Sequence, residues 1–153
     1  MHIEIKPAYD DLENIRLLFG EYTRSLGIDL AFQNYEQELT SLPGKYAPPD
    51  GKLYIAYVDG APAGCIGLRK FDAQSCEMKR LYVRNRFRGL KIGELLAGKV
   101  ISDAARLGYQ AMLLDTLDTM KSAISLYKKL GFVEIAPYYN SPMADTHFLR
   151  LAL

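Results

Sequence analysis

A strand, a basic turn and a helix follow one another directly in residues 78–101, MKRLYVRNRFRGLKIGELLAGKVI. Residues 78–83 are typical of a strand, and residues 94–101 have a helical pattern. Between them, residues 88–93 read RGLKIG and contain two glycines and two cations. This order directs the unpaired backbone N–H groups and the positive dipole end of the helix at one spot. The segment therefore predicts an anion site of the kind that binds pyrophosphate.

The composition around this segment supports the same interpretation. Four cations lie within eight positions: Arg84, Arg86, Arg88 and Lys91. That density is high for a chain whose formal net charge is only +1. Gly89 and Gly93 let the main chain approach a ligand closely. The segment matches neither the P-loop nor the GxGxxG dinucleotide pattern. The alternative interpretation is a strand-to-helix turn whose glycines supply only flexibility.

The bulk properties predict one ordinary domain. The chain has 153 residues, 49% of them apolar and 24% charged, which suits a single core without a linker. A net charge near zero gives no global attraction to nucleic acid or to a membrane. Cys65 and Cys76 are too few for a disulfide framework, and we expect both to be buried. With no signal peptide and no apolar run of about 20 residues, we expect a cytoplasmic protein. The oligomeric state stays open, a homodimer included.

Outward from residues 78–101, hydrophobic periodicity predicts the remaining elements. We expect strands over residues 2–6, 52–58, 62–70, 75–83, 111–115, 132–135 and 146–153. We expect helices over residues 12–26, 35–42, 94–106 and 120–130. The Asp59-Gly60 pair predicts a hairpin, and Gly64 and Gly67 predict a bulge or a close approach. The order β-α-α-β-β-β-α-β-α-β-β is that of a mixed α/β domain.

The RGLKIG segment resembles the acetyl-CoA motif of the GNAT superfamily of N-acetyltransferases, Arg/Gln-x-x-Gly-x-Gly/Ala, which follows a strand. Arg88 and Gly93 match the outer positions, and Lys91 replaces the inner glycine. We expect Lys91 to adopt helical backbone angles, so that main-chain binding survives. The resemblance implies pyrophosphate on the amides from Arg88 to Glu94 and pantetheine beside Leu81 to Val83, where the sheet splays open. The implied coenzyme A contacts are Leu81, Tyr82, Val83, Arg88, Gly89, Leu90, Lys91, Ile92, Gly93, Glu94 and Tyr127.

A second segment carries the same resemblance. Residues 123–132, AISLYKKLGF, look like the family's Ala-x-x-x-Tyr-x-x-x-Gly-Phe, whose helix flanks coenzyme A and whose tyrosine lies near the sulfur. Met120 stands where the family often has an asparagine. The resemblance spans residues 1–153 and implies a GNAT fold with a splayed central sheet. It also implies direct acetyl transfer to the amine of a small molecule or peptide, without metal. The alternative is a non-catalytic acyl-CoA-binding or sensing module.

Direct transfer needs a base for the amine and an acid for the departing thiolate. Tyr127 is the expected acid, because an ordinary tyrosine stays protonated at neutral pH. Glu77 is the expected base, since some family members carry a glutamate at that position. The alternatives are a core tyrosine and a surface carboxylate paired with Lys79. Asp115 ranks lower, as a group that orients others. The two histidines do not form a metal set.

The resemblance implies an acceptor site held by the first helices, their connection and the loop between the last two strands, which here contain residues 26–35 and 135–145. We expect aromatic and polar side chains to line it: Phe32, Gln33, Tyr46, Tyr138, Tyr139 and Asn140. The alternative is a tyrosine cluster that caps the core. No strongly acidic wall is visible in these segments, which argues against a polycationic acceptor.

Overall fold

The structure, a computed structural model, describes residues 1–27, 29–30 and 33–153. In this part of the chain one mixed sheet has the strand order β1-β2-β3-β4-β5-β7-β6. The strands are β1 (Ile3–Pro7), β2 (Lys52–Val58), β3 (Ala61–Lys70), β4 (Ser75–Val83), β5 (Ala111–Leu117), β6 (Val133–Ile135) and β7 (Thr146–Ala152). The helices are α1 (Leu12–Leu26), α2 (Tyr35–Thr40), α3 (Ile92–Arg106) and α4 (Lys121–Lys129). The predicted element order is confirmed, with ends displaced by a few residues.

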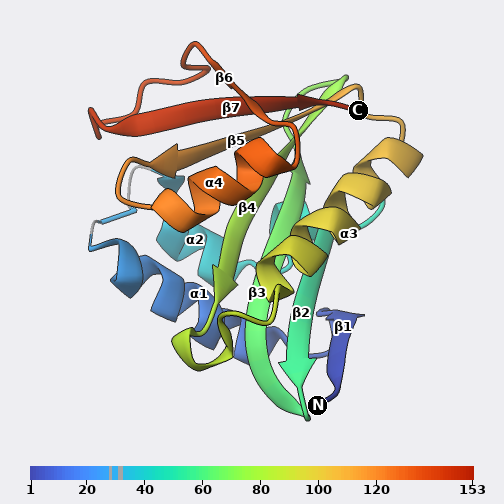
Figure 1. The fold of residues 1–153 in the computed structure, drawn as a ribbon. Coiled ribbons are helices and arrows are strands. Elements are labelled where there is room, and N and C mark those ends of the chain that lie inside the picture. The colour runs from blue at the N-terminus through green and yellow to red at the C-terminus, as the bar shows by residue number, and fades with distance from the viewer. Residues whose placement is uncertain (28, 31–32) are drawn as a thin grey trace.

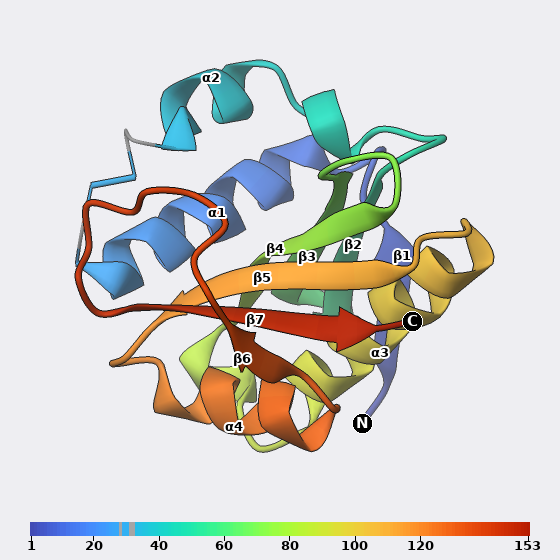
Figure 2. The ribbon, with the colours of Figure 1, turned by 90° about the horizontal axis from the view of Figure 1, so that it is seen from above.

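Helices cover both faces of the sheet, α1 and α2 on one and α3 and α4 on the other (Figures 1 and 2). Each face therefore has its own buried cluster. The cluster under α1 includes Ile15, Leu18 and Phe19, and the larger cluster under α3 and α4 includes Leu96 and Met112. Burial on both faces explains the near-continuous apolar run of β5.

Two local predictions about the β2–β3 region are confirmed. Asp59 and Gly60 both have positive φ angles, 49° and 84°, as a tight hairpin turn with the right-handed sheet twist requires. Gly67 provides a close approach, because a Cβ there would lie 2.6 Å from the ring of Tyr46. Tyr46 is 1% exposed and packs edge-on against Phe19. Gly67 thus lets an aromatic ring lie directly on β3.

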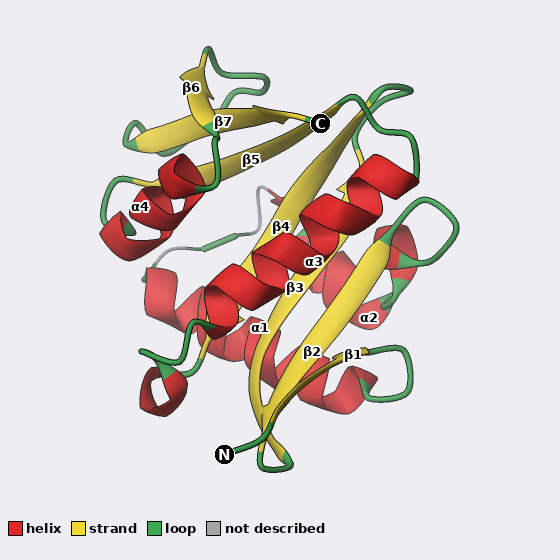
Figure 3. Ribbon diagram, turned by 45° about the vertical axis from the view of Figure 1, so that its right-hand side comes forward, coloured by secondary structure: helices red, strands yellow, loops and turns green. Residues whose placement is uncertain are grey.

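The sheet opens between β4 and β5, which is the feature that positions the site (Figure 3). These strands pair in parallel only between Ser75–Glu77 and Ala111–Leu113. On its other edge β4 carries a bulge: between the pairs Cys65–Tyr82 and Gly67–Lys79, two residues of β4, Arg80 and Leu81, lie opposite the single residue Ile66 of β3. Arg80, inside this bulge, has a φ of 60°. The predicted splay of the central sheet is therefore confirmed, and the bulge lies beside it.

No described helix combines the length and the apolar character that crossing a membrane requires.

Candidate functional site

A pocket lies where β4 and β5 separate. Its walls come from α1 and the segment after it, from β4 and β5, from the start of α4, and from residues 139–146. The side chains that bear on chemistry are Lys79, Arg80, Asp115, Thr116, Tyr127 and Tyr139. The pocket therefore combines charged, hydroxyl-bearing and aromatic groups at the place where two neighbouring strands of the sheet separate.

The loop before α3 leaves a row of backbone N–H groups unpaired. The first helical bond of α3 runs from the Leu95 N–H to the Lys91 carbonyl. Among the described residues, the N–H groups of residues 89–94 have no hydrogen-bond partner. The Arg88 N–H already donates to the Asn85 carbonyl at 3.2 Å, so the row is one amide shorter than expected. Such a row at a helix start suits an anion.

The expectation for the Lys91 backbone is wrong. Lys91 does not adopt right-handed helical angles but stands before α3 with φ 63° and ψ 25°. This left-handed conformation favours glycine, which explains why the resembled motif has glycine at this position. Lys91 nevertheless keeps the turn, and its side chain is exposed.

The four cations of the loop do not act together. Arg84 is bound to Glu21 of α1 at 2.7 Å and donates to the Pro62 carbonyl, so it ties the loop to the fold. Arg86 stacks on Phe87 at 4.4 Å. Arg88 is exposed and its Nε donates to the Val83 carbonyl at 3.3 Å. Arg86, Arg88 and Lys91 are therefore the exposed cations of this loop.

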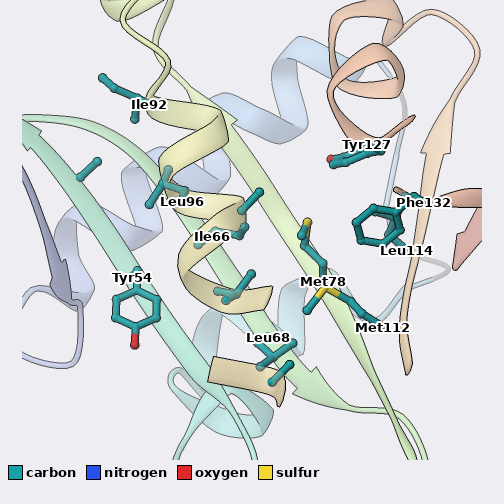
Figure 4. Packing of buried hydrophobic residues seen from close by; sticks show 14 of the residues in the cluster. Tyr54, Ile66, Leu68, Met78, Ile92, Leu96, Met112, Leu114, Tyr127 and Phe132 are labelled. Atoms are coloured by element: carbon teal, nitrogen blue, oxygen red, sulfur yellow. The ribbon is translucent and has the colours of Figure 1, made fainter. Parts of the chain in front are cut away.

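Tyr127 projects from α4 (Figure 4) and lines the pocket. Its side chain is 6% exposed and packs edge-on against Phe132. Burial raises the pKa of Tyr127, and Tyr22 and Asp115 raise it further. Within the described part of the chain no group forms a hydrogen bond with its hydroxyl. Tyr127 is thus a core residue whose protonated hydroxyl lines the pocket.

Glu77 lies next to the pocket but not in its lining. The side chain is 3% exposed, and its Oε1 accepts from Arg69 at 2.9 Å. Its Oε2 accepts from the Tyr138 hydroxyl at 2.6 Å. Arg69 is the register partner of Glu77 on β3. The alternative interpretation, a surface carboxylate paired with Lys79, is wrong, because Glu77 is buried and Lys79 forms its ion pair with Asp115.

Asp115 is the carboxylate that lines the pocket. One oxygen accepts from the Tyr139 hydroxyl, and the other lies 3.4 Å from the Lys79 amine. Burial alone raises the pKa of Asp115, but the charge of Lys79 and the Tyr139 hydrogen bond outweigh it, so the pKa is lowered. Burial lowers the pKa of Lys79, and Asp115 partly offsets that effect.

Lys79, Arg80 and Thr116 were not expected in the site. A regular strand would place Lys79 and Arg80 on opposite faces, but the bulge turns both toward the pocket. Charged residues at Glu77, Lys79 and Arg80 in an otherwise apolar strand are the one sequence signal that marks them. Thr116 is 6% exposed, and its Oγ1 has no partner among the described residues.

The expected acceptor residues divide into three groups. Gln33 and Tyr139 line the pocket. Tyr138 packs beside it against Phe71, Tyr139 and Phe148, as the capping alternative had it, and Asn140 is exposed outside the lining. Tyr46 is wrong as a lining residue of this pocket, since it belongs to the core under α1. Phe32 lies outside the described residues.

The two histidines, which were not expected in the site, do not line the pocket. His147 binds Asp118 at 3.0 Å and approaches Glu134 at 3.4 Å. His2 is exposed near the N-terminus. Over residues 1–27, 29–30 and 33–153, no group of three or more His, Cys, Asp or Glu side chains could hold a metal ion.

Known proteins share both the sequence and the arrangement. The acetyltransferase (GNAT) family matches residues 12–132. An uncharacterized N-acetyltransferase of Schizosaccharomyces pombe is 43% identical over 94% of this chain and 89% of its own length. One of Dictyostelium discoideum is 37% identical, with both chains fully covered. A PaiA N-acetyltransferase of Thermoplasma acidophilum, solved in complex with coenzyme A, superposes with a TM-score of 0.75 at 19% identity and full coverage of both chains.

The family match covers most of the chain, the S. pombe relative covers nearly all of it, and the opened sheet with its loop before α3 is present. The chain belongs to the GNAT family of acetyltransferases.

Proposed function

We propose that this protein is an N-acetyltransferase that moves an acetyl group from acetyl-CoA to the amine of a small molecule or peptide by direct attack. The observation that carries the proposal is the pairing of two features at one opening of the sheet. These are the row of unpaired amides at residues 89–94 and the protonated Tyr127 hydroxyl in the pocket. The coenzyme A in the T. acidophilum structure supports the choice of co-substrate.

The cofactor would bind along the open edge of β4. Beyond Glu77 this edge has no β5 partner, so Leu81, Tyr82 and Val83 can pair with the pantetheine arm as an added strand would. The pyrophosphate would then lie on the amides of residues 89–94, close to the exposed Arg88 and Lys91. The thioester would face the pocket.

The reaction removes two protons from the ammonium nitrogen and replaces the C–S bond of the thioester with a C–N bond. The amine, which enters as an ammonium ion, first loses a proton to a carboxylate or to water. Its nitrogen then forms a bond to the acetyl carbon, and the C–S bond breaks. Tyr127 gives its proton to the departing thiolate and regains one from the acetylated nitrogen through the pocket. The net products are the amide, the free thiol and one proton released to solvent.

Two carboxylates are candidates for the base. Glu77 is the base predicted from the sequence, and because its oxygens are held by Arg69 and Tyr138, it would act through the Tyr138 hydroxyl. Asp115 lines the pocket itself and is the more direct acceptor. Glu77→Gln and Asp115→Asn separate the two candidates. The variant that removes the true base should lower kcat most at low pH, where the amine is protonated. Equal and small losses in both would assign the step to water.

The Tyr127 assignment is tested by Tyr127→Phe. We expect kcat to fall by about 10²-fold or more, the usual contribution of a general acid, while coenzyme A affinity stays the same. Tyr109→Phe is the matched control, because the Tyr109 hydroxyl bonds the Asp50 carbonyl away from the pocket. Thiol release from acetyl-CoA measures both. Unchanged turnover in Tyr127→Phe would remove this residue from the mechanism.

The cofactor site is tested by Gly89→Asp. Gly89 has a φ of 87° and open space around it, so the aspartate has room, strains the backbone as it would at any such position, and sets a negative charge beside the pyrophosphate. Gly60→Asp is a close control, since Gly60 has a φ of 84°, equal room and a place in the distant β2–β3 turn. We expect calorimetry to show weaker coenzyme A binding only for Gly89→Asp. If the protein binds coenzyme A but acetylates none of a broad amine panel, the chain is a binding module instead.

A further inference from the structure

Two cationic side chains of β4 are buried at the pocket, where a charge is costly without an anion close by. Lys79 is 5% exposed and Arg80 is 4% exposed, and both line the pocket. Neither belongs to the loop before α3, so the proposed pyrophosphate site does not account for them. Their neighbours show which of the two has bonding capacity to spare.

Arg80 is held by the protein through three hydrogen bonds. Its Nε and Nη2 donate to the two oxygens of Glu38 at 3.0 and 3.2 Å, and its Nη1 donates to the Gln33 oxygen at 2.8 Å. The Arg80–Glu38 pair is thus neutral and fixed. It holds the Gln33 side chain with its oxygen toward Lys79, 3.2 Å away.

The polar contacts of the Lys79 ammonium are longer than most of those of Arg80. An ammonium group has three N–H donors, and charge-assisted bonds are usually about 2.7–2.9 Å long. In the part of the chain that the structure describes, Lys79 reaches only Gln33 at 3.2 Å and Asp115 at 3.4 Å. Asp115 faces the same space, with its other oxygen held by Tyr139. The result is a loose, buried pair of opposite charges at the wall of a pocket.

A loose pair of this kind is complementary to a zwitterion. A molecule with an ammonium and a carboxylate on one carbon can set its ammonium on Asp115 and its carboxylate on Lys79, so every charge gains a close partner. A simple monocationic amine would gain Asp115 but would meet the positive charge of Lys79. A polyamine would bring further positive charge toward Lys79. The charge arrangement therefore selects for an acceptor that brings its own negative group.

Resting on the proposed function, we propose that the acceptor is an α-amino acid or a closely similar carboxylate-bearing primary amine, with its carboxylate on Lys79 and its amine beside Asp115. Thr116 gives independent support for a ligand here, because this residue lines the pocket and its buried Oγ1 has no partner among the described residues. The amine nitrogen forms the new bond to the acetyl carbon, the C–S bond breaks, one proton goes to the thiolate and one to solvent. The product lacks the ammonium, so Asp115 loses the positive partner that the acceptor brought, which favours release.

The test compares acceptors that differ only at the carboxylate. The panel contains the protein amino acids, their α-amides and the corresponding decarboxylated amines, each with saturating acetyl-CoA and thiol release as the readout. We expect at least one amino acid to have a kcat/KM about tenfold or more above its amide, the size of one charge-assisted hydrogen bond. The amide has the more easily deprotonated amine, so intrinsic reactivity runs against this result.

A variant ties the preference to Lys79. Lys79→Gln keeps a hydrogen-bond donor but removes the charge. We expect it to raise the KM for the amino acid and to bring the kcat/KM of the amino acid down to that of its amide. Lys6→Gln on β1 is the control, because the Lys6 side chain is 56% exposed, pairs with Glu4 and does not belong to the pocket lining. If Lys79→Gln fails to fold, as checked by circular dichroism and coenzyme A affinity, the acceptor panel on the unaltered protein decides alone.

The outcomes are distinguishable. Amides, decarboxylated amines or peptide N-termini that are acetylated as well as the amino acids overturn this inference and leave the proposed function in place. A preference for the acid that persists in Lys79→Gln overturns the assignment to Lys79. Coenzyme A binding without acetylation of any amine overturns the proposed function itself.

Discussion

Thr116→Val is expected to stabilise the ligand-free protein. The Thr116 side chain is 6% exposed, and its hydroxyl has no hydrogen-bond partner among the described residues. A buried polar group without a partner costs about 1–3 kcal/mol, and valine has the same shape without that group. We therefore expect the free energy of unfolding to rise by about 1–2 kcal/mol. For a chain of this length each kcal/mol raises Tm by about 2–4 °C.

The same substitution is expected to impair function. A hydroxyl on the pocket wall can bond a ligand that enters between β4 and β5, and valine cannot. Losing one neutral hydrogen bond corresponds to about 1 kcal/mol, which would raise the KM for acetyl-CoA or for the acceptor several-fold. Greater stability with weaker binding in one variant is the pattern of a group kept for a ligand.

Urea unfolding followed by far-UV circular dichroism measures the stability, since the chain has no tryptophan to report by fluorescence. Thr23→Val is the control, because the Thr23 hydroxyl already donates to the Phe19 carbonyl at 2.9 Å. We expect no gain in that variant. If Thr116→Val unfolds at the same or lower urea concentration as the unaltered protein, the hydroxyl is satisfied and the reasoning is wrong.

Three further predictions concern the scaffold. Gly67→Ala places a Cβ 2.6 Å from the Tyr46 ring and should lower the free energy of unfolding by about 1–3 kcal/mol or more, and an unchanged urea midpoint would show that the ring moves freely. Lys91→Gly replaces a lysine in a left-handed backbone conformation and should raise the free energy of unfolding by up to about 1 kcal/mol, as measured by thermal unfolding. The hydrogen bond of His147 to Asp118 raises its pKa, so its contribution to stability is present below its unfolded pKa and is lost as pH rises through the folded value. His147→Gln should therefore lose more stability at pH 5.5 than at pH 8, and an equal loss at both would contradict the assignment.

The secondary structure was predictable because its signals are local. Hydrophobic periodicity marked each helix and strand, and glycine or proline marked the turns, so all predicted elements recur within a few residues of their expected ends. The anion loop was predictable for the same reason, since a strand, glycines and a helix start adjoin in sequence. Two details of the loop differed: the Arg88 N–H bonds the Asn85 carbonyl, and Lys91, although not a glycine, occupies a left-handed position.

The charge pairing of the site was decided by tertiary structure alone. Glu77 binds Arg69 of the neighbouring strand, and Lys79 faces Asp115, 36 residues further along the chain. The bulge at Arg80 breaks the two-residue alternation from which a side chain's face is inferred, and so it brings Lys79 and Arg80 to one pocket. The sequence by itself determined that a cofactor loop and a tyrosine-bearing helix exist. Which charged groups surround the acceptor depended on where distant strands pair and where they part, because electrostatic partners are set by distance in space.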